Sequence, residues 1–596
     1  MTEPTRLFDC IQYQMAISPL PDMLAGKENG TWQKYSTEEV AQTVDNLSAG
    51  LLATGISCGD MTAEGRDKVG LISKNRPEWL MVDLAVQQVG GILTPIYPTI
   101  GITELEFVLL EAQVQMIFVN DEFLLEKVRS ILPRLPLLEK IYTFEKIEGA
   151  DHWKSLLSLS TPELLASVKN VSASVRYEDI ATIIYTSGTT GKPKGVMLSH
   201  KNILSNVIAS IPYFPPGEKL RTLSFLPLNH IFEKMVSYVY LFKGASIYYA
   251  ESMETIGENL KEVKPHMFTT VPRLLEKVYE RIMKTGRELT GIKKKLFFWA
   301  HDLAVEFDIN KRMGLGYDIQ LWLANKIIFN KWRQALGNNI LCIVSGGAAC
   351  QERLIRIFTA AKIIVMEGYG LTETSPVISV NRYQEKDRMI GTVGPLITDV
   401  EVMFSDDGEI FCKGPNVMIG YYKNPELTAE AMEGEWFKTG DIGLMTEGKF
   451  LKITDRKKEM FKTSGGKYVA PLMLENKLKE SRFIENVMIV GAGQKYVAAL
   501  LIPSVTDLKE WAHDNKLNSN TLKELLNHEK VKAFYTEIIN SFNALFNHTE
   551  QIKKFALLPQ EWTIEGGELT PKLSLRRKVI MEKYASEISN LYPEEY

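Results

Sequence analysis

The residues most suited to chemistry lie between positions 185 and 195, in the sequence YTSGTTGKPKG. This stretch has three glycines, four aliphatic hydroxyl residues and two lysines, and it follows an apolar run at 180–184 that predicts a strand. Glycines bring backbone N–H groups close to an anion, hydroxyls donate further hydrogen bonds, and lysines supply positive charge. We therefore expect a phosphate-binding loop, made of Thr186, Ser187, Gly188, Thr189, Thr190, Gly191 and Lys192.

This loop differs from a Walker P-loop. Too few residues separate Gly188 from the Gly-Lys pair, and Pro193 stands where serine or threonine would hold magnesium. The sequence thus predicts that the protein binds a nucleoside triphosphate in another way than P-loop kinases and motors do.

The segment 185–195 resembles the phosphate loop of the acyl-adenylate-forming enzymes, the superfamily of acyl-CoA synthetases, stand-alone adenylation domains and luciferases. A second matching segment is EGYGLTETSP at 367–376, preceded by the small-residue turn SGGAA at 345–349. In the family these two loops hold adenine, the phosphates and magnesium. The resemblance implies the nucleotide-binding residues Gly347, Tyr369, Gly370 and Thr372, and places Glu373 on Mg²⁺.

Further matches lie between residues 435 and 471. EWFKTGDIG, at 435–443, resembles the ribose-binding turn, which implies that Asp441 and Arg456 contact the ribose. Lys458 falls at the position of the family's hinge, about which the C-terminal domain rotates between two catalytic poses. Gly465 and Gly466 fall where the CoA pantetheine passes the backbone, and Lys462 is a candidate phosphate contact.

The chain departs from the family near its C-terminus. Long-chain members usually carry a lysine two residues before a basic pair, and this lysine bridges the substrate carboxylate and the α-phosphate. Here the pair is Arg576-Arg577, and Ser574 stands at the lysine position. We expect Lys572 to replace the lysine, with Arg576 as the second candidate and Lys578, or no replacement, as the remaining ones.

Three segments resemble long-chain fatty acyl-CoA synthetases: 91–99, 227–233 and 271–279. The resemblance implies two half-reactions, in which a long-chain fatty acid and ATP give acyl-AMP and pyrophosphate, and CoA then gives acyl-CoA and AMP. The mixed anhydride is already activated, so no enzyme nucleophile is required. His230 is expected to orient the carboxylate or gate the acyl channel, unless it is a structural histidine. The expected catalytic residues are Lys192, Thr189, Glu373, His230 and Lys572.

Two other functions remain open at this point. The first is an adenylating enzyme that loads a carrier protein instead of free CoA. The second is a non-catalytic acyl or nucleotide sensor on the same fold, although a sensor would not need the full set of phosphate and metal groups.

Composition limits the possible partners. The 596 residues have a net charge of −4 without long runs of one sign, which predicts no nucleic-acid partner. Five scattered cysteines give neither a disulfide framework nor a zinc site. There is no signal-like N-terminus and no long uncharged apolar run. These features predict a cytoplasmic protein, and leave peripheral membrane contact and the oligomeric state open.

The elements that must position these residues alternate between strands and helices. Strands are expected at 69–73, 115–119, 245–249, 267–270 and 340–344, with a helix at 78–89. This alternation favours an α/β fold with parallel sheets between helices. Residues 293–336 are expected to be helical, with a break only at 314–316. The expected domains are residues 1–456, with the ATP and acyl sites, and 457–596, a small mobile α+β domain.

Overall fold

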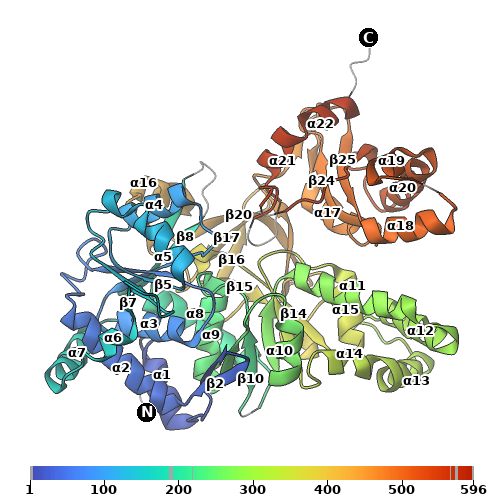
Figure 1. Ribbon diagram of the computed structural model, residues 1–596. Helices are drawn as coiled ribbons and strands as arrows, with labels where there is room; N and C mark the ends of the chain where they lie inside the picture. The colour runs from blue at the N-terminus through green and yellow to red at the C-terminus, as the bar shows by residue number, and fades with distance from the viewer. Residues whose placement is uncertain are drawn as a thin grey trace.

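The computed structural model describes residues 4–186, 192–217, 219–517, 519–563, 565–570 and 575–592. Within these residues, two eight-stranded sheets and one five-stranded sheet lie before residue 457, and a smaller unit with a three-stranded sheet follows (Figure 1). The expected fold class, an α/β N-terminal domain with a small α+β C-terminal domain, is confirmed.

The first eight-stranded sheet has the order β18-β9-β8-β4-β3-β5-β6-β7. The strands from β8 to β7 run parallel to one another, whereas β9 and β18 pair antiparallel at one edge. Every residue of β3 and β4 is buried, as expected for parallel strands covered by helices on both faces. The strands are β3 (Lys68–Ile72), β4 (Ile92–Ile96), β5 (Val114–Val119), β6 (Lys140–Thr143), β7 (Asp151–His152), β8 (Ile180–Thr186), β9 (Lys194–Ser199) and β18 (Gly420–Tyr421).

The second eight-stranded sheet has the order β15-β14-β13-β12-β10-β11-β1-β2. Its strands are parallel from β14 to β1, so the carboxyl ends of β12, β13 and β14 meet at one edge. The strands are β1 (Leu24–Glu28), β2 (Thr31–Tyr35), β10 (Arg221–Ser224), β11 (Ser246–Tyr249), β12 (Met267–Thr270), β13 (Cys342–Ser345), β14 (Ile364–Gly370) and β15 (Val377–Val380).

The third sheet is antiparallel and precedes the C-terminal domain. It contains β16 (Glu401–Phe404), β17 (Glu409–Lys413), β19 (Met432–Glu433), β20 (Trp436–Thr446) and β21 (Phe450–Arg456). The C-terminal domain has a short hairpin and a three-stranded sheet, made of β22 (Phe461–Lys462), β23 (Tyr468–Val469), β24 (Ile484–Val490), β25 (Val497–Pro503) and β26 (Ile552–Leu557).

Helices cover the sheets. Before residue 457 they are α1 (Asp9–Ile17), α2 (Thr37–Ala53), α3 (Pro77–Gln88), α4 (Ile102–Glu111), α5 (Glu122–Arg129), α6 (Lys154–Leu157), α7 (Pro162–Ser174), α8 (His200–Ser210), α9 (Ile231–Lys243), α10 (Ile256–Val263), α11 (Pro272–Glu288), α12 (Gly291–Glu306), α13 (Leu315–Ala324), α14 (Asn330–Ala335), α15 (Glu352–Ala360) and α16 (Pro425–Ala431). The C-terminal domain has α17 (Pro471–Leu478), α18 (Val505–Asp514), α19 (Leu522–Asn527), α20 (Glu529–Asn543), α21 (Arg577–Lys583) and α22 (Ala585–Leu591).

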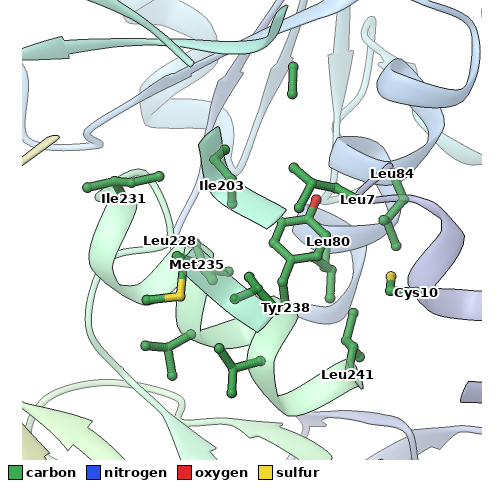
Figure 2. Close-up of a cluster of buried hydrophobic side chains, with 14 of the residues drawn as sticks. Leu7, Cys10, Leu80, Leu84, Ile203, Leu228, Ile231, Met235, Tyr238 and Leu241 are labelled. Carbon is green, nitrogen blue, oxygen red and sulfur yellow. The ribbon is translucent and has the colours of Figure 1, made fainter. Parts of the chain in front are cut away.

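The helix expected at 78–89 is α3, and it packs with α1, α8 and α9 in a buried apolar core (Figure 2). A buried ion pair crosses this core between Lys234 of α9 and Asp83 of α3, and neither side chain is exposed. The Tyr238 hydroxyl and the Gln87 side-chain amide also donate to the Asp83 carboxylate. The bonds from Lys234 and Tyr238 to Asp83 hold α9 against α3, and α9 begins directly after the candidate residue His230.

The helical region 293–336 was predicted with its break in the wrong place. α12 ends at Glu306, and α13 begins at Leu315, so Gly316 is helical and the break covers 307–314. A π-helical turn, η3 (Asn325–Phe329), then joins α13 to α14. Gly314 has a positive φ of 93°, which fits a residue at the end of the break but not one within a helix.

The C-terminal domain contacts α11 through ion pairs. Arg273 pairs with Glu485, and Arg287 pairs with Asp507. Figure 1 shows α17 and α18 above α11, which agrees with these pairs. They fix the orientation of the two domains in this structure.

Candidate active site

β8 and β9 form a hairpin, and the predicted phosphate loop lies between them in the sequence. β8 ends at Thr186 and β9 begins at Lys194, and these two residues are register partners. The strand expected before the loop is therefore present. Lys192 is exposed. The remaining loop residues lie outside the described residues, so their roles stay predictions: Ser187, Gly188, Thr189, Thr190 and Gly191.

Glu373 lies in a cluster with Lys194 and Tyr421. It follows β14 in the 3-10 turn η4 (Thr372–Thr374), and it is 7% exposed. Lys194 Nζ and the Tyr421 hydroxyl each donate to Glu373 Oε1 over 2.9 Å. The lysine also donates to the Tyr421 hydroxyl over 2.5 Å. Because a buried carboxylate needs such partners, these two side chains fix the position of the predicted magnesium ligand.

Sequence reasoning missed Tyr421 and gave Lys194 only a general role as a positive charge. Tyr421 lies in β18, which joins the sheet beside β9 although more than 200 residues separate the two strands. Burial raises the pKa of its hydroxyl, which therefore remains a hydrogen-bond donor. No motif around residue 421 connects it with the phosphate loop, so only the fold reveals the contact.

Tyr369, Asp441 and Arg456 form a second cluster. The Tyr369 hydroxyl donates to Asp441 Oδ2 over 2.7 Å, and Arg456 Nε lies 3.3 Å from Asp441 Oδ1. Asp441 and Arg456 are register partners on β20 and β21, which explains their proximity. Burial raises the pKa of Asp441, and the positive charge of Arg456 opposes this effect. Because 58% of the Arg456 side chain is exposed, a polar ligand can approach this pair from solvent.

Two glycines shape the turns beside this cluster. Gly347 follows β13 with a φ of 80°, a conformation that favours glycine. A Cβ atom at Gly370 would lie 1.7 Å from the backbone oxygen of Pro376, so no larger residue fits there. Since β13 and β14 are parallel neighbours, the structure brings these turns to one edge of the sheet.

His230 caps the N-terminus of α9. Its Nδ1 accepts a hydrogen bond from the backbone N–H of Phe232 over 3.1 Å, which is a structural role. The aromatic ring of Phe232 lies against Gly346, so this end of α9 borders the turn after β13. One turn later, burial raises the pKa of Glu233 to about 7, and its carboxylate accepts a hydrogen bond from Thr269. The structure therefore places His230 near the candidate site, and its role toward the substrate stays a prediction.

The C-terminal candidates belong to a separate surface. Gly465 and Gly466 form the exposed turn between β22 and β23, and Gly466 has a φ of 75°. Lys462 Nζ lies 4.5 Å from the ring centroid of Tyr468 in the same hairpin. Lys572 lies outside the described residues.

The two arginines of the basic pair 576–577 have different surroundings. Arg577 donates to Glu475 over 2.6 Å and to Glu459 over 3.0 Å, so its charge is neutralised within the C-terminal domain. Arg576, by contrast, is exposed at the N-terminus of α21. Of these two arginines, Arg576 is therefore the one available to a substrate.

Comparison with known protein families agrees with this geometry. A family model described as AMP-binding enzyme matches residues 16–422, and one described as AMP-binding enzyme C-terminal domain matches residues 459–596. The chain belongs to the AMP-binding enzyme family. Residues 423–458 lie between the two matches, and this interval contains Asp441 and Arg456.

Relatives in this family match over most of their length. Long-chain-fatty-acid–CoA ligase FadD15 of Mycobacterium bovis is 31% identical, with 95% of this chain and 94% of the relative covered. The peroxisomal long chain acyl-CoA synthetase 7 of Arabidopsis thaliana is 32% identical, with 95% and 82% covered. Long-chain-fatty-acid–CoA ligase 1 of Homo sapiens is 30% identical, with 99% and 86% covered.

Solved structures share the fold. The anthranilate CoA ligase AuaEII in complex with anthranoyl-AMP has a TM-score of 0.72 and 18% identity, and 98% of each chain is covered. The adenylation domain of a carboxylate reductase from Mycobacterium chelonae has a TM-score of 0.74 and 19% identity, with 99% of this chain and 91% of that domain covered.

Proposed function

We propose that this AMP-binding enzyme converts a long-chain fatty acid to its CoA thioester in two steps. The carboxylate attacks the α-phosphorus of ATP, and acyl-AMP forms while pyrophosphate leaves. The CoA thiol then loses its proton and attacks the acyl carbon, and the thioester forms while AMP leaves. The observation that carries the proposal is the cluster of Tyr369, Asp441 and Arg456, which offers an aromatic ring for a base and charged groups for a ribose. The names of the relatives support the choice of acid.

The phosphates of ATP must be neutralised before a carboxylate can approach them. We assign this role to the loop from Thr186 to Lys192, because its exposed lysine and the adjacent Lys194 provide positive charge at the end of β8. Thr372, which is buried beside Glu373, would add a hydroxyl donor. Gly347 and Gly370 let the backbone pass close to the nucleotide.

Glu373 fits a magnesium site of the kind that relies on substrate phosphates. No group of three or more His, Cys, Asp or Glu side chains that could hold a metal occurs in the described part of the chain. Mg²⁺ in ATP-dependent enzymes is held by one or two carboxylates together with phosphate and water, so a single well-positioned glutamate suffices. The ion would neutralise charge on the phosphates. Lys194 and Tyr421 would hold the carboxylate in place.

The second half-reaction requires a different surface from the first, so we propose that the C-terminal domain, residues 457–596, rotates about Lys458. Lys457 Nζ lies 2.7 Å from both Asp407 and Glu409, which tie it to the third sheet. Glu459, on the other side, is held by Arg577 of the C-terminal domain. The exposed Lys458 is therefore the residue between two anchored neighbours, as a hinge requires.

Each face of the C-terminal domain would then serve one step. We assign the turn of Gly465 and Gly466 to the CoA pantetheine, with Lys462 as a phosphate contact, because these three residues are exposed and no described atom lies within 4 Å of the place of a Cβ atom at Gly466. Lys572, with Arg576 as the second candidate, would bridge the carboxylate and the α-phosphate during adenylation. His230 would orient the fatty acid carboxylate from the start of α9.

ATP–pyrophosphate exchange across a panel of acids tests the proposal. We expect exchange with palmitate, little exchange with acetate or benzoate, and faster AMP release when free CoA is added. AMP release that responds to a phosphopantetheinylated carrier protein but not to free CoA would favour the carrier-loading alternative. ATP binding without exchange with any acid would favour a sensor.

A further inference from the structure

α13 carries large apolar side chains on a face that is open to solvent. Leu315 is 83% exposed, Ile319 is 61% exposed and Trp322 is 57% exposed. With Leu323 they follow the spacing i, i+4, i+7 and i+8, which places them on one side of a helix. The opposite side, with Tyr317, Leu321 and Ala324, packs against the core. α13 is therefore apolar on two sides, and none of the residues that the structure describes covers one of them.

Basic residues lie at the ends of this face, and one exposed acidic residue, Asp318, lies on α13 itself. α12 and α13 form an antiparallel pair, in which Trp299 Nε1 donates to Gln320 Oε1 over 3.3 Å and the Tyr317 hydroxyl donates to the backbone oxygen of Leu303 over 2.6 Å. Counting along both helices from these two contacts places the N-terminus of α12 beside the end of α13 and the turn η3. That end carries the exposed residues Ile292, Lys293, Lys294, Lys295, Lys326 and Ile327. Lys326 Nζ lies 5.0 Å from the ring centroid of Trp322.

The charge of this region is opposite in sign to that of the whole protein. Residues 291–336 contain eight basic and four acidic residues, a formal charge of +4, whereas the chain as a whole has −4. Lys311 and Arg312 add exposed positive charge just before α13. Figure 1 shows α12 and α13 at the outer edge of the molecule. A projecting apolar stripe between basic groups thus forms one continuous surface, which we name the α12–α13 face.

We propose that the α12–α13 face binds the surface of a bilayer that contains anionic phospholipid. Exposed Leu, Ile and Trp side chains enter the boundary between headgroups and acyl chains, and flanking lysines pair with anionic headgroups. No helix in the described residues is long and apolar enough to cross a membrane, so the contact would be peripheral. A second copy of this chain fits the face less well, because a two-fold contact would bring two patches of positive charge together.

The binding itself does not depend on the catalytic proposal. The benefit of membrane binding to the enzyme does depend on that proposal. A long-chain fatty acid partitions into bilayers, so an enzyme attached to the bilayer meets its substrate there. The α12–α14 region also packs on the core beneath β10, β12 and β13, near whose carboxyl ends the candidate site lies.

Flotation of the full chain with vesicles tests the proposal. We expect the protein to float with vesicles of equal parts phosphatidylcholine and phosphatidylglycerol, at least tenfold more than with phosphatidylcholine alone, and to bind less in 0.5 M salt. The fluorescence emission of Trp322, obtained by subtracting the spectrum of Trp322→Phe from that of the parent, should shift to shorter wavelength when anionic vesicles are added.

Two variants and one control complete the experiment. Leu315→Ser combined with Ile319→Ser should lower flotation at least tenfold, and Lys293→Gln with Lys294→Gln and Lys295→Gln should remove most of the preference for anionic vesicles. Phe123→Ser is the matched control, because Phe123 is 73% exposed on α5, away from this face.

Equal flotation of the parent and both variants would overturn the proposal, as would no flotation at all. A change of oligomeric state in the serine variant without vesicle binding would replace the membrane by a second copy. Exchange with octanoate in solution should be the same for all variants, so a failure of vesicle binding is distinguishable from a failure of the proposed reaction.

Discussion

Replacing Glu373 with Gln removes one negative charge from the proposed magnesium site while keeping the shape of the side chain. Adenylation should fall on the order of 10²-fold, as for other single electrostatic groups, which equals about 2.7 kcal/mol in the barrier. The concentration of Mg²⁺ at half-maximal rate should rise, because the remaining ligands would be phosphate and water. Both quantities follow from ATP–pyrophosphate exchange with palmitate, measured over a series of Mg²⁺ concentrations.

The structure predicts that this variant still folds. Glu373 Oε1 accepts two hydrogen bonds of 2.9 Å, from Lys194 and Tyr421. Hydrogen bonds to charged groups contribute about 1.5–3 kcal/mol and neutral ones about 0.5–1.5, so the two losses together are about 2–3 kcal/mol. The Lys194 side chain is 27% exposed and regains part of this through water.

Tyr421→Phe is the matched control, since it keeps the charge of Glu373 and removes only the two hydrogen bonds of the Tyr421 hydroxyl, one to Glu373 and one from Lys194. Its exchange rate should fall less than tenfold. The reasoning would be refuted if Glu373→Gln bound ATP normally and exchanged pyrophosphate at the parental rate with an unchanged dependence on Mg²⁺.

Four further predictions test other parts of the protein. The value of kcat/KM should rise from octanoate to palmitate. The eight additional methylenes contribute at most roughly 6 kcal/mol of free energy, at about 0.8 kcal/mol each. A maximum of kcat/KM at acetate or at an aromatic acid would contradict this prediction. Lys458→Pro should still form acyl-AMP but lose most thioester formation, because proline fixes φ near −65° at the hinge; a variant with both activities would exclude Lys458. Lys572→Ala should depress acyl-AMP formation while supplied acyl-AMP is still converted to thioester; if only Arg576→Ala separates the two activities, the bridging charge is Arg576. Lys234→Met should destabilise the N-terminal domain by about 3–5 kcal/mol in urea unfolding, since it leaves Asp83 buried without its cation, and Lys234→Met with Asp83→Leu should recover most of this loss.

The sequence predicted the features that depend on local pattern. Apolar runs gave the strand before the phosphate loop and the parallel strands β3 and β5, and small-residue turns marked Gly347 and Gly370. Asp441 and Arg456 could be paired only through the family resemblance, and the register of β20 and β21 explains why they meet.

Contacts between distant segments could not be predicted in this way. The bond between Tyr421 and Glu373 depends on β18 joining the sheet beside β9, and the pair of Lys234 and Asp83 depends on how two helices pack. The break before α13 was misplaced because the glycines at 314 and 316 were both read as helix breakers. In the structure Gly314 precedes the helix and Gly316 lies within it.

The most direct test of the two-step account is a single-turnover reaction of the enzyme with palmitate and ATP, quenched at intervals and analysed by mass spectrometry. Without CoA, the account predicts palmitoyl-AMP in an amount close to that of the enzyme, together with pyrophosphate. On addition of CoA, palmitoyl-AMP should disappear at the rate at which palmitoyl-CoA and AMP form. Thioester formation with release of ADP and phosphate, or without any palmitoyl-AMP that CoA can consume, would contradict it.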